Sequence, residues 1–331
     1  MEIGQHRLVA SHQGVAQGAG ADLPVESRLP SFDGATTWLN SHPLTPESLR
    51  GSVVLVQFWT YTCINWLRTL PYVRAWADRY RDLGVVVIGV HTPEFAFEKQ
   101  LDNVRRAAKS MQVDYPIAVD NDYAVWRAFA NHCWPALYFA DAKGRIRHHR
   151  FGEGDYERSE MTIRQLLADA GRDALTPGLV EVHAIGPEVA ADWADLASPE
   201  NYLGSDRTSN FEETPTHLRL NHWALSGDWT AAPDSIHLNQ PGGQISYRFH
   251  ARDLHLAMGP AAGETSVRFR VRLDGQPPGP AHGVDVDAEG RGTVSEQRMY
   301  QLIRQPKPIV DRQFEIEFLD SGLDAFVFTF G

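Results

Sequence analysis

Cysteine is scarce in this chain of 331 residues, which holds only Cys63 and Cys133. Two cysteines cannot build a disulfide-stapled scaffold or a cysteine-rich zinc module. No stretch approaches the ~20 consecutive apolar residues that span a bilayer. The first residues also lack a basic segment followed by an apolar one, so no secretory signal is evident. The sequence as written therefore predicts a cytoplasmic protein without a membrane segment.

Positive charge is also in short supply, because 31 Lys and Arg stand against 42 Asp and Glu, a net charge of -11. Nucleic acids and anionic membranes bind basic surfaces, so neither is an expected partner. The hydrophobic share of 43% and the charged share of 22% are typical of a globular protein. The length suggests two domains of ordinary size, each able to bury its own core.

The pattern along the chain predicts a tail, two domains and a linker. Residues 1–27 are rich in Gly, Ala, Gln and His and lack apolar periodicity, which is typical of a flexible tail. Residues 28–172 alternate buried strands with amphipathic helices, one of them over 97–111, which predicts an α/β layer. A linker with Gly and Pro, 173–186, then leads to 187–331. There, alternation with period two between turns predicts an antiparallel, jelly-roll-like β-sandwich.

One thiol lies where a buried strand meets a helix. The run 53–59 is almost wholly apolar, and beyond Cys63 apolar residues recur at spacings of three and four. This pattern predicts an amphipathic helix that begins at the cysteine and lies on the sheet. The free N–H groups and the positive dipole end of a helix N-terminus favour a thiolate. We therefore expect Cys63 to be exposed and reactive, with a lowered pKa.

Several features resemble known proteins. A strand ending in Phe-Trp, then Cys63, then Pro71 eight residues later, and Trp134-Pro135 before another strand together resemble the thioredoxin fold. Four further sequence segments resemble the soluble C-terminal region of DipZ-type thiol-disulfide proteins. These segments are 58–61, 89–94, 151–156 and 328–331. The resemblance implies a TlpA-like thioredoxin domain joined to a β-sandwich similar to a carbohydrate-binding module. It also implies a cis peptide bond before Pro135, and relatives that carry membrane helices upstream and work outside the cytoplasm.

Two departures from that family concern the chemistry. Where the relatives have Cys-x-x-Cys, this chain has Cys63-Ile64-Asn65-Trp66, so the resolving thiol is absent. The buried strand position where thioredoxins place a proton-relaying carboxylate holds Gln57, whose amide cannot ionise. Both losses affect the release of a mixed disulfide by a second thiolate. The attack by the first thiol is unaffected.

The expected site has one nucleophile, Cys63, and a groove formed by Trp59, Thr62, Trp66, Trp134 and Pro135. Trp66 either shields the thiol or packs in the core. Cys133 could act as a second thiol. It could instead be an incidental thiol at the rim of the site, because in this fold the two positions are usually farther apart than the ~7 Å between Cα atoms that a disulfide allows. Glu94 and Glu153 are expected to be solvated. No cofactor or metal is expected at this site.

Two features of the second domain concern ligands. One acidic segment matches the spacing of an EF-hand calcium loop except at position five: Asp285, Asp287, Glu289 and Glu296. Its flanks predict strands instead of helices, so we expect an acidic hairpin turn. Trp193, Trp223 and Trp229 could offer an aromatic platform to a sugar, although lone tryptophans in a β-sandwich usually belong to the core. A carbohydrate or protein ligand of this domain stays open.

These observations favour a thiol-disulfide oxidoreductase of the thioredoxin superfamily that works through one cysteine. Its substrates would be protein or low-molecular-weight thiols and disulfides, and glutathione or Cys133 would resolve the mixed disulfide. A one-cysteine peroxidase is an alternative, because Thr60 matches the peroxiredoxin pattern although Val56 stands where peroxiredoxins have proline. A second alternative is a redox-inactive binding or scaffold protein, since both the resolving thiol and the buried acid are missing.

Overall fold

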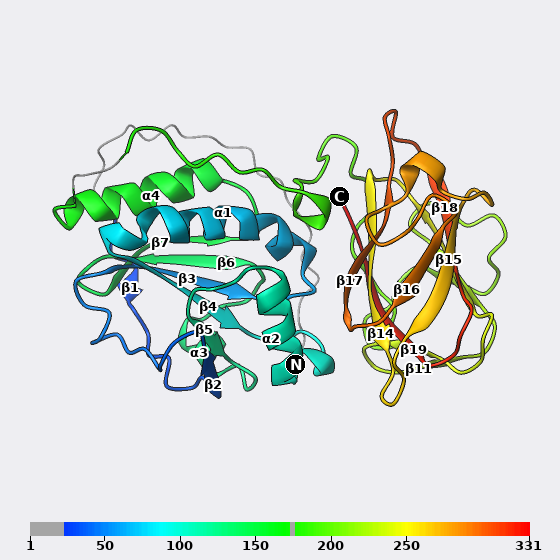
Figure 1. Ribbon diagram of the computed structural model, residues 1–331, viewed down its shortest axis with the longest axis horizontal. Coiled ribbons are helices and arrows are strands. Elements are labelled where there is room, and N and C mark those ends of the chain that lie inside the picture. Colours follow the sequence, from blue (N-terminus) through cyan, green and yellow to red (C-terminus); the bar gives the residue numbers. More distant parts are fainter. Residues whose placement is uncertain (1–22, 173–175) are drawn as a thin grey trace.

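The computed structural model describes residues 23–172 and 176–331. Two domains lie side by side, and within the described residues all four α-helices belong to the first of them (Figure 1). The second domain consists of strands and their connections. This arrangement confirms the predicted α/β domain followed by an antiparallel sandwich. None of the described helices has the length and apolar character needed to cross a membrane. Of the predicted tail, residues 1–22 lie outside the described part of the chain.

The first domain is built on a seven-stranded sheet with the order β1-β7-β6-β3-β4-β5-β2. The strands are β1 (Ser27–Arg28), β2 (Thr37–Leu39), β3 (Val53–Trp59), β4 (Val85–His91), β5 (Ile117–Val119), β6 (Ala136–Ala140) and β7 (Arg145–Phe151). β3, β4 and β5 run parallel, whereas β6 is antiparallel to β3. Every residue of β3 is buried, as expected for a central strand covered on both faces.

Helices cover both faces of this sheet. α1 (Ile64–Tyr80) and α4 (Tyr156–Asp169) lie on one face, and α3 (Ala124–Ala128) lies on the other (Figure 1). A separate hydrophobic cluster fills each side, one around α1 and α4 and one around α3. The two faces therefore have distinct cores.

The predicted helix over 97–111 is wrong in its extent, because the structure has two shorter pieces. These are the 3-10 helix η2 (Ala96–Lys99) and α2 (Leu101–Ser110), separated by an extended residue, Gln100. The Asn103 side-chain amide donates to the Phe97 carbonyl at 2.9 Å. A side chain thus satisfies a backbone acceptor that a continuous helix would have used. The remaining 3-10 helices are η1 (Arg81–Leu83), η3 (Gly186–Glu188) and η4 (Gly279–Ala281).

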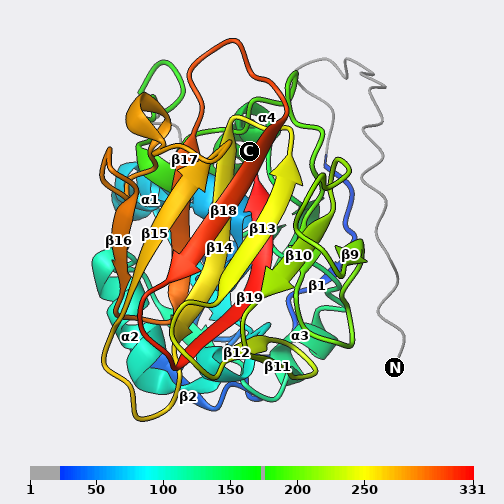
Figure 2. The ribbon, with the colours of Figure 1, turned by 90° about the vertical axis from the view of Figure 1, so that its right-hand side faces the viewer.

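The second domain packs two six-stranded sheets face to face. The outer sheet has the order β16-β15-β18-β13-β10-β9, and the inner sheet has the order β11-β12-β19-β14-β17 with β8 paired to β19 (Figure 2). The strands are β8 (Asn201–Tyr202), β9 (Phe211–Glu212), β10 (Trp223–Ser226), β11 (Trp229–Ala231), β12 (Ile236–Leu238), β13 (Gln244–Phe249), β14 (Asp253–Pro260), β15 (Val267–Leu273), β16 (Arg291–Val294), β17 (Arg298–Arg304), β18 (Arg312–Phe318) and β19 (Leu323–Phe330). Apart from the parallel pair of β9 and β10, the pairings within these sheets are antiparallel.

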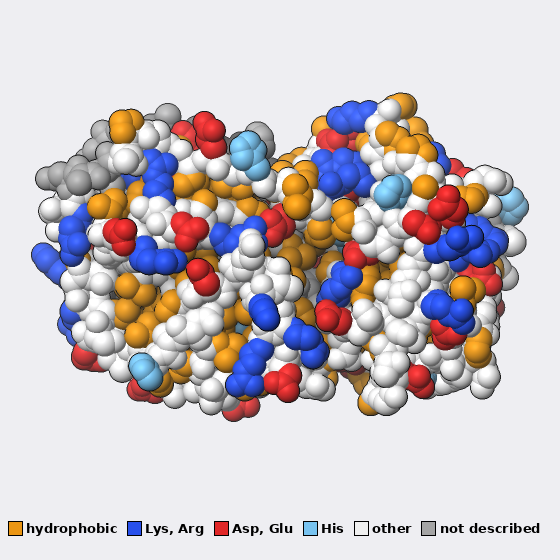
Figure 3. All heavy atoms as spheres, viewed as in Figure 1, with side chains coloured by type: hydrophobic (Ala, Val, Ile, Leu, Met, Phe, Trp, Pro, Cys, Tyr) orange, Lys and Arg blue, Asp and Glu red, His pale blue; other side chains and the backbone are white. Residues whose placement is uncertain are grey.

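The inner sheet packs against the first domain. The Phe326 ring of β19 lies 5.1 Å from the Phe95 ring and 4.7 Å from the Phe97 ring, measured between centroids. Ala257, Met299 and other inner-sheet residues share one hydrophobic cluster with α1 and β3. The space-filling view shows a notch between the two domains, with hydrophobic side chains along it (Figure 3). The sandwich is thus docked on the α/β domain through apolar contacts.

The segment between the domains is held along α1 and α4. The Arg79 guanidinium donates to the Gly178 carbonyl at 2.8 Å, and the Glu160 carboxylate accepts the Val180 N–H at 2.9 Å. Farther along, Arg74 pairs with Glu188 at 2.7 Å. The described part of the predicted linker therefore follows the surface of the first domain, while 173–175 lie outside the described residues.

Candidate thiol site

Cys63 is the N-cap residue of α1, as the sequence predicts. β3 ends at Trp59, and the Cys63 N–H closes a turn by donating to the Thr60 carbonyl at 3.2 Å. The Cys63 carbonyl then accepts the Leu67 N–H at 3.0 Å, which is the first bond of the helix. The thiol therefore lies at the carboxyl end of a central strand and at the N-terminus of the longest helix described in the structure.

The thiol is half-buried beside the peptide that joins Trp134 to Pro135. The Cys63 Sγ lies 3.9 Å from the Trp134 carbonyl oxygen, and the Trp134-Pro135 bond is cis. The resemblance to thioredoxins implies both the cis bond and its place opposite the cysteine, and the structure confirms them. Trp134 is partly exposed and Pro135 is buried.

The lowered thiol pKa expected from the helix N-terminus is wrong. Burial raises the pKa of Cys63 well above its ordinary value, and the Glu200 carboxylate raises it further. The backbone N–H groups of Trp66 and Asn65 act in the expected direction and lower the pKa. Desolvation of the thiolate outweighs their effect. At neutral pH Cys63 is therefore predominantly a thiol.

Two residues predicted to line the groove belong to the core instead. Trp59 and Trp66 are fully buried, and their rings stack with centroids 4.5 Å apart. Trp66 thus packs in the core, which was one of its two expected roles. Thr62 is buried as well, and its hydroxyl donates to the Glu98 carboxylate at 2.6 Å. Their effect on Cys63 is indirect, since they hold the turn and the first helical residues.

Cys133 packs on the opposite face of the sheet from Cys63. It contacts the cluster around α3, whereas Cys63 contacts the cluster around α1. Its Sγ lies 3.7 Å from the Pro135 carbonyl oxygen, and burial raises its pKa. Both cysteines are free thiols. A role for Cys133 as a second thiol stays a prediction.

The position of the missing buried acid is occupied by a neutral hydrogen-bonded pair. Gln57 is fully buried, and its amide oxygen accepts the Tyr115 hydroxyl at 3.0 Å. Nearby, His91 lies on β4 with its ring 4.8 Å from the Trp59 ring, and burial lowers the pKa of His91 to about 3. The imidazole is therefore neutral. Neither residue can exchange a proton with a thiol at neutral pH.

Glu98 is a buried carboxylate that the sequence reasoning missed. It accepts the Thr62 hydroxyl at 2.6 Å and the N–H groups of Glu94 and Phe95 at 2.6 and 2.9 Å. Burial nevertheless raises the pKa of Glu98 to about 7. Glutamate three residues after the start of a turn is the spacing of a capping box, and this was the signal that could have identified it. Glu98 braces the turn that precedes Cys63.

The two carboxylates expected to be solvated are buried in contacts with arginines. The Glu94 side chain is 13% exposed and accepts Arg207 at 3.0 Å, and the Glu153 side chain is 9% exposed and accepts Arg68 at 3.0 Å. Arg207 comes from the second domain. The expectation failed because each carboxylate is covered by chain that is distant in sequence.

The EF-hand-like segment of the second domain contains a turn, as expected, but the expected strand ahead of it is wrong, because the 3-10 helix η4 precedes it, and Glu296 lies beyond β16. Asp285 pairs with Arg298 at 2.6 Å, and Asp287 accepts the Arg291 N–H at 2.7 Å. The Gly290 N–H donates to the Asp287 carbonyl at 2.9 Å, which closes the turn before β16. Within 23–172 and 176–331 no three His, Cys, Asp or Glu side chains converge as metal ligands would.

The three tryptophans of the second domain do not share a surface. Trp193 is 58% exposed, whereas Trp223 is buried and Trp229 is partly buried against the sandwich core. A common platform for a sugar ring is therefore not formed. The sugar-binding interpretation receives no support from these residues.

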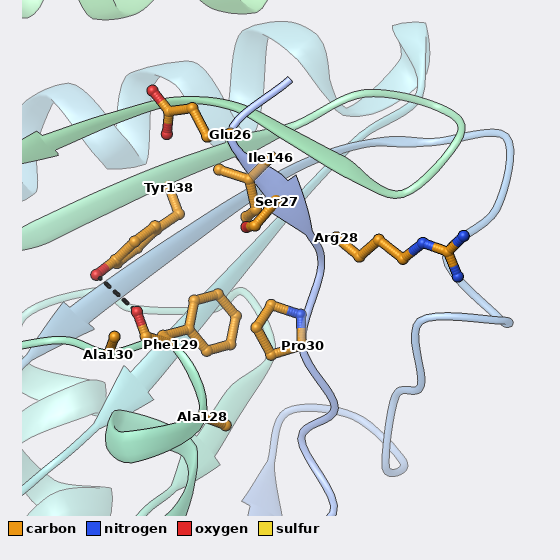
Figure 4. A pocket seen from close by; sticks show the side chains of 9 residues that line it. All are labelled: Glu26, Ser27, Arg28, Pro30, Ala128, Phe129, Ala130, Tyr138 and Ile146. Carbon is orange, nitrogen blue, oxygen red and sulfur yellow. Dashed lines mark hydrogen bonds between the residues drawn. The ribbon is translucent and has the colours of Figure 1, made fainter. Parts of the chain in front are cut away.

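A cavity of about 260 Å³ opens beside β1 and α3 (Figure 4). It is lined by Glu26, Ser27, Arg28, Pro30, Ala128, Phe129, Ala130, Tyr138 and Ile146. Several of these belong to the cluster around α3, on the face opposite Cys63. No residue of the thiol site lines it.

Comparison with known proteins identifies sequence relatives of both domains. Residues 24–167 match the family model described as Redoxin, and residues 195–331 match the one described as thioredoxin like C-terminal domain. The first match lies within the α/β domain and the second within the β-sandwich domain. A solved "thioredoxin-like protein in the oxidized form" is 29% identical and covers 44% of this chain and 97% of its own, with a TM-score of 0.41.

Among curated proteins, Protein DipZ of Mycobacterium tuberculosis and of Mycobacterium bovis is 39% identical to this chain over 262 residues. The match covers 75% of this chain and 36% of DipZ, so the chain spans about a third of those relatives. Thiol-disulfide oxidoreductase YkuV of Bacillus subtilis is 28% identical over 147 residues, 44% of this chain and 99% of YkuV. The resemblance to the C-terminal region of DipZ-type proteins is therefore confirmed.

Proposed function

We propose that this chain is a thiol-disulfide oxidoreductase in which Cys63 is the sole nucleophile. The observation that carries the proposal is the place of Cys63 at the N-terminus of α1, 3.9 Å from the carbonyl that precedes cis-Pro135. The sequence match to YkuV, which bears the name thiol-disulfide oxidoreductase, supports the class of reaction. The single-cysteine mechanism follows from Trp66 standing at the resolving position.

The reaction needs three thiol-disulfide exchanges, two at Cys63 and one in solution. The Cys63 thiolate attacks one sulfur of a substrate disulfide, whose S–S bond breaks, and the departing thiolate takes up a proton. An external thiol such as glutathione then attacks the mixed disulfide and regenerates the Cys63 thiolate. A second external thiol then reduces the disulfide formed between the first external thiol and the substrate sulfur. The two electrons therefore come from two external thiols. Protein disulfides and low-molecular-weight disulfides are both candidate substrates.

The raised pKa of Cys63 favours a second candidate, a binding protein without turnover. A thiol that ionises only at high pH supplies little thiolate at neutral pH. In addition, the sandwich docks at the edge of the first domain that carries Cys63. The same argument disfavours a one-cysteine peroxidase, because peroxide also reacts with the thiolate. The oxidoreductase and the binding protein differ in whether the chain speeds up thiol-disulfide exchange above the rate of glutathione alone.

A glutathione-coupled disulfide-reduction assay on the full chain tests the proposal. We expect turnover above the rate of glutathione alone, increasing with pH because the thiolate fraction increases. Cys63→Ser should lower the rate to that background, and Cys133→Ser, the matched control, should leave it within about twofold. Equal rates for the parent and Cys63→Ser would refute the oxidoreductase and leave the binding protein.

A further inference from the structure

One segment of the first domain, residues 94–98, lies between the thiol turn and the second domain. β3 and β4 are parallel neighbours, and Trp59, the last residue of β3, is paired with His91, the last residue of β4. The turn that carries Cys63 and the segment 94–98 follow these two strand ends, so both emerge at the same edge of the sheet. There the segment contacts both the turn and the inner sheet of the sandwich.

The sandwich holds this segment through polar and apolar contacts. The Glu94 side chain accepts the Tyr202 hydroxyl at 2.6 Å and the Arg207 guanidinium at 3.0 Å. Arg207 also lies over the Phe95 ring, 5.7 Å from its centroid. On the same ring packs Phe326 of β19, with the two centroids 5.1 Å apart. Side chains of β8, of the loop after it and of β19 therefore fix the segment from the second domain.

Glu98 connects this segment to the thiol turn. Its side chain is fully buried. One carboxylate oxygen accepts the Thr62 hydroxyl at 2.6 Å, and the other accepts the N–H groups of Glu94 and Phe95 at 2.6 and 2.9 Å. At mildly alkaline pH, above its pKa of about 7, Glu98 is ionised, which strengthens all of these bonds. A single carboxylate thus joins the segment that the sandwich holds to the residue before Cys63.

The position of the turn affects the sulfur that it carries. The turn is closed by the Cys63 N–H, which donates to the Thr60 carbonyl at 3.2 Å, and Thr62 lies inside it. The N–H groups of Asn65 and Trp66 lower the pKa of the Cys63 thiol, and they can act only while the sulfur stays beside them. A turn that moves more freely would hold the sulfur there for less of the time. The thiolate would then be less favoured.

We propose that the sandwich domain positions the reactive thiol of the first domain. Residues 94–98 transmit the contact, and the bond between Glu98 and Thr62 holds Cys63 at the N-terminus of α1. Thr62 and Glu98 are positioning residues, because they act through the turn and not on the substrate. The inference rests on the proposed role of Cys63 as the nucleophile. It gives the second domain a part in the thiol chemistry.

The first test compares two substitutions of Thr62 by the rate at which iodoacetamide alkylates Cys63 at mildly alkaline pH, in the full chain with Cys133→Ser. Thr62→Val keeps the branched shape but removes the hydroxyl, whereas Thr62→Ser keeps the hydroxyl and loses a methyl group. We expect Thr62→Val to be about tenfold slower than the parent, equivalent to one pKa unit for the thiol, and Thr62→Ser to stay within about threefold of it. A role in packing alone would reverse this order. Thr62→Val that reacts as fast as Thr62→Ser, or faster, would overturn the proposal.

The second test addresses the contribution of the sandwich. Phe326→Leu removes the ring that contacts η2 but keeps an apolar side chain, and it should slow the alkylation by about threefold. In the Thr62→Val background the same change should have no further effect, because both changes break one chain of contacts. Phe318→Leu is the matched control and should leave the rate unchanged, since Phe318 is buried beside Phe269 in the separate core of the sandwich.

Three results of the second test would overturn the proposal. They are an unchanged or faster rate for Phe326→Leu, an equal loss of rate in Phe318→Leu, and an undiminished loss in the Thr62→Val background. Because alkylation requires no turnover, the outcome is independent of the glutathione-coupled assay.

Discussion

Arg68→Ala should lower the free energy of unfolding by about 3–5 kcal/mol, since it leaves a buried charge without its partner. Arg68 is 3% exposed and pairs with Glu153 at 3.0 Å. Its guanidinium also donates to the Phe330 carbonyl of β19 at 2.8 Å, which ties α1 to the second domain. Burial already raises the pKa of Glu153 in the presence of Arg68. Denaturant unfolding followed by tryptophan fluorescence measures the loss.

Arg81→Ala is the matched control for that measurement. Arg81 follows the same helix and pairs with Asp78 at 3.3 Å, but both side chains are exposed, so the loss should stay below about 1 kcal/mol. The pair replacement Arg68→Met with Glu153→Leu should recover most of the stability, because no charge then remains buried. A loss for Arg68→Ala as small as that for Arg81→Ala would show that neither the buried pair with Glu153 nor the bond to the Phe330 carbonyl contributes appreciably to stability.

Trp66→Cys should convert the site into one that resolves its own mixed disulfide. Positions 63 and 66 are the N-cap and the third residue of α1, one helical turn apart, within the Cα separation of ~4.4–6.8 Å that a disulfide spans. Mild oxidation in a Cys133→Ser background should then remove both thiols. Release of the substrate sulfur held in the mixed disulfide with Cys63 should no longer depend on the glutathione concentration, as a rapid-quench measurement would show.

The same change should destabilise the protein. Trp66 is fully buried against Trp59, and truncation of a buried tryptophan costs about 3–5 kcal/mol. Trp66→Ala is the matched control, because it creates a similar cavity without a thiol and should still need glutathione. If folded Trp66→Cys kept two free thiols under conditions that oxidise small dithiols, the first turn of α1 would not hold the geometry of a dithiol site.

The local part of the site could be predicted from the sequence. The apolar run of β3 and the periodic residues after Cys63 predict a strand, a turn and a helix N-terminus, because these patterns depend on near neighbours. The cis bond before Pro135 came from the resemblance to thioredoxins. Glu98 could have been found from its capping-box spacing, which is also a local signal.

The electrostatics of the site could not be predicted in this way. Tyr202 contacts Glu94 across 108 residues, and the contact exists only because the inner sheet of the sandwich docks on the first domain. The pKa of Cys63 is set mainly by burial, which depends on tertiary packing and not on the helix that the sequence reveals. The interpretation of Glu94 and Glu153 as solvated failed for the same reason.

The most direct test is to expose the folded chain to oxidised glutathione at mildly alkaline pH, quench with acid and map the modified peptide by mass spectrometry. We expect one glutathione on Cys63, released again by reduced glutathione, while the protein stays folded. Cys63 that remains unmodified until denaturant is added would contradict the account, because the nucleophile would then be closed to any substrate.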